Sequence, residues 1–249
     1  MPERPPSFEP ARLKRNIEWA LRHAFEERDV LPMVEALARS AERGSRDWVF
    51  AHRQLAELVV EKHPWRAAIA ARVVARFAPD DDGARALQGL ALTLLGHYRC
   101  AVRAYRAALV IAPDNPWYAH NLGHLLDVAL NRPHEALGLL RRAFLAEPHP
   151  EIASSLAHAL ARTGRVDEAK RVLSKALRGS RPTPDQAALL EWLDQGAPLV
   201  RPGAGKGRGK KQQQKRLAAV PLHHTFAPSS EARAEQQRDF AYPVARRLP

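Results

Sequence analysis

The stretch GARALQGLALTLLGHYRCAVRAYRAALVIAPDN, residues 83–115, carries the features that decide the fold. Its apolar residues recur at spacings of three and four as far as Leu95, a pattern typical of an amphipathic helix. Gly96 predicts the end of that helix, because glycine adopts the left-handed cap conformation at little cost. A second periodic segment runs from about Tyr98 to Ile111 and stops before Pro113, since proline disfavours helical geometry in the preceding residue. The stretch therefore predicts two antiparallel helices.

The same pattern recurs along the chain at a nearly constant interval. Prolines lie 34, 35 and 34 residues apart, at Pro79, Pro113, Pro148 and Pro182. Small residues recur at intervals of 34, at Gly89, Gly123 and Ala157, and alanines at 35 and 33, at Ala101, Ala136 and Ala169. We place the one-residue excess at Asn131-Arg132-Pro133, a predicted turn that can absorb an insertion. Helix pairs repeated in this way stack to bury a continuous core.

Three local motifs resemble tetratricopeptide repeats: Asn121-Leu122-Gly123, the Gly96-His97-Tyr98 turn, and the helix end from Tyr105 to Pro113. The resemblance is close over 82–115, 116–149 and 150–183, and it extends to 48–81. It implies an all-α fold, a right-handed α-solenoid of four to five helix-turn-helix repeats with a C-terminal capping helix and a disordered basic tail.

Four segments follow from this interpretation. Residues 1–46 form an N-terminal helix pair, which is a possible degenerate repeat, and residues 47–183 form the repeats. Thr183, Pro184 and Asp185 are a favourable helix start and predict a capping helix over 184–196. Residues 197–249 are rich in Pro, Gly, Gln and charge, so we expect a flexible basic tail.

Composition narrows the cellular setting. No run approaches the roughly 18 apolar residues of a membrane helix, and the basic start lacks the apolar stretch of a secretory signal. Cys100 is the single cysteine, which excludes an internal disulfide and a cysteine-based zinc cluster. We predict a cytoplasmic protein. Arginine outnumbers lysine 31 to 8, which we interpret as GC-rich coding in a bacterium.

Enzymatic motifs are missing from the sequence. GAGKGRGKK, residues 203–211, fails the spacing of a phosphate-binding loop and has no preceding strand. No GxSxG, HExxH or paired-carboxylate motif is present. We therefore predict neither an enzyme nor a cofactor.

His120, His124 and Asp127 share one helix face, at spacings of four and three. Two imidazoles and a carboxylate could ligate a metal. The resemblance implies instead that this face lines a concave groove that binds a partner peptide. The predicted groove residues are Trp117, His120, Asn121, His124, Asp127, Ser154 and His158. Because they include no lysine or arginine, we do not predict the family's grip on C-terminal carboxylates.

The C-terminal segment is strongly basic, with eleven Lys or Arg and three Asp or Glu in residues 200–249. Six of these positive charges are clustered, at Lys206, Arg208, Lys210, Lys211, Lys215 and Arg216. This cluster could bind nucleic acid or an anionic surface weakly, or it could be a solubilising linker. FAYPVARRLP, residues 240–249, could be a short docking peptide. The predicted function is a protein–protein interaction scaffold that binds a partner peptide in its groove, and the alternative is a nucleic-acid-associated factor using the tail.

Overall fold

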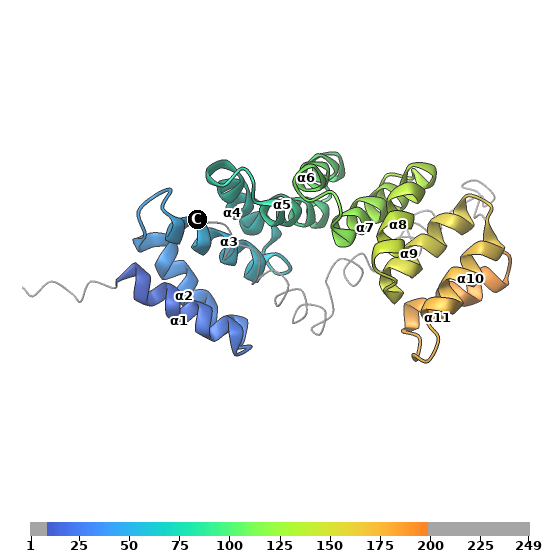
Figure 1. Cartoon of the computed structure of the whole chain (residues 1–249), viewed down its shortest axis with the longest axis horizontal. Helices are drawn as coiled ribbons and strands as arrows, with labels where there is room; N and C mark the ends of the chain where they lie inside the picture. The colour runs from blue at the N-terminus through green and yellow to red at the C-terminus, as the bar shows by residue number, and fades with distance from the viewer. Residues whose placement is uncertain (1–8, 199–249) are drawn as a thin grey trace, which may run out of the picture. The chain divides into compact units, whose positions relative to one another are not determined.

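The computed structural model describes residues 9–198 of the 249-residue chain, and this part is helical without a strand. Helices follow one another as antiparallel pairs, each packed on the next along the sequence (Figure 1). Their bounds are α1 Pro10–Arg22, α2 Glu27–Ser40, α3 Arg46–Val59, α4 Pro64–Phe77, α5 Asp82–Leu94, α6 Tyr98–Ile111, α7 Pro116–His124, the π-helix η1 Leu125–Ala129, α8 Pro133–Ala146, α9 Pro150–Arg162, α10 Val166–Ala176 and α11 Pro184–Asp194. The predicted α-solenoid is confirmed.

Local sequence sets where these helices begin. Six helices have proline in the first turn, where the missing N–H costs nothing: Pro10, Pro64, Pro116, Pro133, Pro150 and Pro184. Asp81 caps α5 by accepting a hydrogen bond from the Ala84 N–H at 2.7 Å. Thr183 and Gln186 form a reciprocal capping box at the start of α11. The helix starts are therefore encoded locally, either by prolines, which have no backbone N–H group, or by side chains that accept hydrogen bonds from the first N–H groups of the helix.

Small residues set how closely the two helices of a repeat approach. A Cβ atom added to Gly89 would lie 3.0 Å from the Tyr105 ring, and one added to Gly123 would lie 2.7 Å from Leu140 Cγ. Ala101 and Ala136 are fully buried at the equivalent crossings. A single apolar cluster runs from Ala101 to Ala197, so the later repeats and α11 share one core. In α11, Leu193 is buried, whereas Ala188 is exposed.

The extra residue of the third repeat lies inside a helix. In the second and fourth repeats, the N–H groups of His97 and Arg165 bond to carbonyls five residues back, and in the third the Arg132 N–H reaches six residues back to Leu126 at 2.8 Å. The insertion is therefore accommodated by η1, between Leu126 and Asn131. Our placement of it in the turn at Asn131-Arg132-Pro133 is wrong, because a widened helical turn can absorb one residue without lengthening the loop.

Asn131 closes this widened turn in the left-handed conformation, with φ +57°. The equivalent turns of the neighbouring repeats use Gly96 at φ +75° and Gly164 at φ +83°. Asparagine tolerates this region better than most residues with a side chain. The side-chain amide of Asn131 lies next to the helix end, and its oxygen accepts a hydrogen bond from Arg162 of the following repeat.

Candidate partner-binding site

The seven predicted groove residues lie on α7, η1 and α9, and their burial divides them into two groups. His120, His124 and Asp127 are buried, with exposed fractions of 1%, 6% and 1%. The prediction that these three contact a partner is wrong, because α9 packs on α7 and covers the face that carries them. The other four are partly exposed: Trp117, Asn121, Ser154 and His158.

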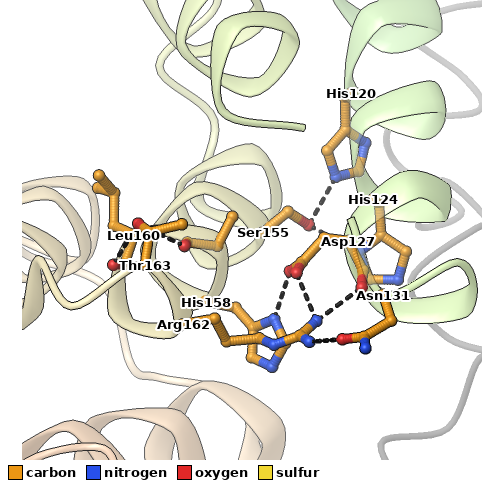
Figure 2. A network of polar contacts seen from close by, with 10 residues as sticks. His120, His124, Asp127, Asn131, Ser155, His158, Leu160, Arg162 and Thr163 are labelled. Atoms are coloured by element: carbon orange, nitrogen blue, oxygen red, sulfur yellow. Dashed lines mark hydrogen bonds and ion pairs between the residues drawn. The ribbon is translucent and has the colours of Figure 1, made fainter. Parts of the chain in front are cut away.

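Ser155 of α9 joins the two buried histidines. Its hydroxyl lies 2.9 Å from His120 Nε2 and 3.1 Å from His124 Nδ1 (Figure 2). A hydroxyl donates one hydrogen bond and accepts others, so Ser155 can donate to one neutral imidazole and accept from the other. This arrangement holds both rings at the junction of the third and fourth repeats.

The electrostatics of this junction favour the neutral form of both imidazoles. Burial, reinforced by the His124 ring, lowers the pKa of His120 from its ordinary value of 6.5 to about 3. Burial and the neighbouring His158 lower the pKa of His124 to about 4, although Asp127 acts in the opposite direction. Both histidines are therefore uncharged near neutral pH.

Asp127 is the buried charge of the junction, and two side chains of α9 compensate it. His158 Nδ1 lies 2.6 Å from Asp127 Oδ2, and Arg162 Nη1 lies 2.6 Å from Oδ1 (Figure 2). The carboxylate itself is 1% exposed. Hydrogen bonds on both oxygens offset much of the cost of burying this charge.

Arg162 also provides hydrogen bonds to groups at the end of η1. Its Nη1 donates to the Asp127 carbonyl at 2.6 Å, and its Nη2 donates to Asn131 Oδ1. Carbonyls at a helix end have no partner within the helix and need one from elsewhere. The arginine of one repeat therefore caps the irregular helix of the preceding repeat.

Sequence reasoning missed Ser155, Arg162 and Asn131. A signal for Arg162 was present, because it lies 35 residues after Asp127, and a separation of about one repeat places two residues on adjacent first helices. A carboxylate and a guanidinium at that separation are candidates for a pair between repeats. The burial that makes this pair important could not be inferred from spacing alone.

The partly exposed residues form what we call the A-helix face, defined as Trp117 and Asn121 of α7 with Ser154 and His158 of α9. The Trp117 ring packs edge-on against His149, with 5.1 Å between ring centroids, and joins a small cluster with Ile152 and Ala143. The His158 side chain is 30% exposed, and its ring lies 5.6 Å from that of Trp192 in α11. The face therefore consists of polar and aromatic groups on packed helices.

The six clustered tail residues, Lys206 to Arg216, lie outside the described residues, so the anion-binding prediction stays a prediction. Within residues 9–198, no group of three His, Cys, Asp or Glu side chains is arranged to hold a metal ion. None of the helices in that range combines the length and the apolar content needed to cross a membrane.

Comparisons with known proteins agree with this architecture. Residues 127–193 match the family described as "Tetratricopeptide repeat". Among solved structures, residues 41 to the end of MamA from Desulfovibrio magneticus RS-1 superpose with a TM-score of 0.59 at 18% identity, covering 68% of this chain and 94% of that one. TTC0263, a thermophilic TPR protein in Thermus thermophilus, gives a TM-score of 0.53 at 20% identity, covering 77% and 98%. A comparison with curated proteins finds no significant match.

At these identities the solved structures bear on the fold alone. The family match over residues 127–193, the fold of the solved structures and the stacked helix pairs together support a tetratricopeptide-repeat protein.

Proposed function

We propose that the chain is a protein–protein interaction scaffold and that its A-helix face binds an extended segment of a partner protein. One observation carries the proposal: polar and aromatic side chains, partly open to solvent, stand on two successive first helices that a buried network joins. Surfaces of stacked repeats are extended, and this suits them to hold a length of peptide rather than a compact ligand.

Three residues of the face, Asn121, Ser154 and Trp117, have a direct role in this proposal. The Asn121 amide and the Ser154 hydroxyl offer hydrogen bonds to a peptide backbone, although Ser154 Oγ also donates to the Pro150 carbonyl at 2.8 Å. Trp117 supplies an aromatic surface of the kind that anchors bound segments. The Asp127–Arg162 contacts fix the spacing between α7 and α9, so a partner meets a preorganised surface and loses less entropy on binding.

The test places a charged, larger side chain on the face. Asn121→Glu with Ser154→Glu should prevent capture of the main partner from an extract of the source cells, while circular dichroism remains helical. The matched control is Asn16→Glu with Ser174→Glu, which makes the same two chemical changes at exposed positions of α1 and α10. If the face variant captures the same partner as the parent, the A-helix face is not the binding surface.

A further inference from the structure

A second surface lies between the second helices of two neighbouring repeats. α6 and α8 border a groove of about 450 Å³ with an apolar floor. The floor is formed by Leu109, Leu122, Leu126 and Leu139. On α7 and η1, Leu122 and Leu126 each lie two residues beyond a buried histidine, about 200° around the helix. The groove therefore opens away from the face of α7 that packs on α9.

Two arginines stand at the rim of this groove, Arg106 of α6 and Arg142 of α8. Both are exposed, and neither takes part in any ion pair formed within residues 9–198. Glu135, the acidic residue of the lining, is paired with Arg132 at 3.2 Å. The rim therefore carries two positive charges that no carboxylate of the described chain neutralises.

The charge on α6 extends beyond the groove. Arg99, Arg103 and Arg106 are exposed and lie at spacings of four and three, so they form one stripe, and the helix contains no acidic residue. Val110 continues the stripe by four residues and is 83% exposed. A helix face that combines a row of arginines with an exposed valine beside an apolar groove is complementary to an acidic, amphipathic segment.

We propose that the groove between α6 and α8 binds an acidic amphipathic helix of a partner protein. Apolar side chains of that helix occupy the floor and contact Val110, and its carboxylates pair with Arg106 and Arg142. The volume lies within the range of about 300–1,000 Å³ found for specific binding pockets. Helices that insert an apolar face into a groove are a common mode of peptide recognition.

The chemistry of the lining favours a protein segment over nucleic acid. The leucine floor gives no benefit to a phosphodiester backbone, and the lining has no aromatic ring on which a base could stack. The surface is separate from the A-helix face, so failure of either proposal leaves the other standing.

The experiment uses the full chain and a fluorescein-labelled synthetic peptide with leucines and glutamates on opposite helical faces. Binding is measured by fluorescence anisotropy at physiological salt. We expect saturable binding, which Arg106→Glu should weaken by about tenfold or more, as for removal of a central anchor. Val110→Glu should weaken it similarly, because the new carboxylate repels the acidic helix.

The repeats supply matched controls for both variants. Arg72 lies 34 residues before Arg106 and is exposed on α4, and Leu145 occupies the position on α8 equivalent to Val110 and is likewise 83% exposed. Arg72→Glu and Leu145→Glu should leave binding unchanged, because neither residue lines the groove.

Several outcomes would overturn the proposal. One is equal loss of affinity in the groove variants and their controls, and another is equal binding of a scrambled peptide of the same composition, because either would indicate nonspecific charge attraction. Binding of a single-stranded oligonucleotide that depends on Arg106, without peptide binding, would assign the groove to nucleic acid. A self-associated parent that becomes monomeric with Val110→Glu would show that a second copy of the chain occupies it.

Discussion

Arg162 of α9 donates hydrogen bonds from one nitrogen to both the carbonyl and the carboxylate of Asp127, each at 2.6 Å. The same guanidinium nitrogen therefore bonds to a backbone group and to the charged side chain of Asp127. The guanidinium supplies a partner for a carbonyl at the end of η1 and compensates a carboxylate that is 1% exposed. The third and fourth repeats are therefore joined through the irregular turn itself.

Removing the guanidinium should be costly. Arg162→Leu should lower the free energy of unfolding by about 3–5 kcal/mol, because it leaves a buried carboxylate without its main counter-charge. Chemical denaturation provides the measurement. Arg141→Leu is the control, since its pair with Glu168 at 2.8 Å is partly exposed and should contribute about 0–1 kcal/mol. Comparable losses in both variants would contradict the role assigned to Arg162.

The buried histidines predict a pH dependence. Their folded-state pKa values of about 3 and about 4 lie below the ordinary 6.5, so protonation favours the unfolded chain. Each therefore contributes stability that is complete above about pH 6.5 and declines as the pH falls toward 4 and 3. At about 1.4 kcal/mol per pH unit for each group, the two together lose up to about 4 kcal/mol between about pH 7 and pH 5.

A variant comparison isolates this effect. Burial raises the pKa of Glu151 to about 8, and this carboxyl acts in the opposite direction over the same pH interval. The measured quantity is therefore the difference in unfolding free energy between the parent and His120→Gln with His124→Gln, at pH 7 and at pH 5. The double variant should lose less stability on acidification, whereas His97→Gln, at an exposed turn, should behave as the parent. A double variant with the parental pH dependence would refute the assignment.

Two glycines should respond in opposite directions to the same substitution. Gly123→Ala should destabilise the protein by about 1–3 kcal/mol, because the new Cβ would meet Leu140 Cγ at 2.7 Å. Gly138→Ala should stabilise it by up to about 1 kcal/mol, because this glycine lies within α8 and has no atom within 4 Å of the added Cβ. Thermal unfolding followed by circular dichroism measures both. The same sign for both substitutions would contradict the observed packing.

The basic tail is predicted to bind anions weakly and without sequence preference. If six clustered charges each contacted a phosphate of single-stranded nucleic acid, log affinity would fall with log salt with a slope of about −4. Anisotropy with two unrelated oligonucleotides at low and physiological salt provides the measurement. A chain ending at Gly196 should lose this binding and keep its helical spectrum. Tight, sequence-dependent binding at physiological salt would instead support the nucleic-acid-associated alternative.

The repeat pattern predicted the fold well because the start and end of each helix are set by residues at that point of the sequence. Gly96 ends a helix through its own conformation, and α6 spans the predicted Tyr98–Ile111. Periodicity also placed His120, His124 and Asp127 correctly on one helix face. It could not decide what covers that face, because burial depends on how closely α9 approaches α7. A histidine facing a neighbouring helix and one facing solvent have the same spacing in sequence.

The position of the insertion shows a second limit. Counting residues locates one extra residue between Leu126 and Ala136, but either a loop or a widened helical turn satisfies that count. In the structure the turn is widened, and its end contacts Arg162 of the next repeat. The groove between α6 and α8 was likewise missed, because its floor combines leucines from four separate elements.

The contacts between neighbouring repeats differ in strength along the chain, and this has a consequence for how the chain unfolds. One repeat earlier, 34 residues before Asp127 and Arg162, the equivalent positions hold Thr93 and Val128. The junction between the second and third repeats therefore lacks the ionic contact found at the junction between the third and fourth. At that earlier junction Tyr118 donates a hydrogen bond to Asp82 at 2.9 Å, and α5 contacts α7 less than α7 contacts α9. Linear arrays derive much of their cooperativity from such nearest-neighbour contacts. We therefore expect the amide hydrogens of α7 and α9 to exchange with solvent together. They should also exchange more slowly than those of a second unit, which ends at Ile111.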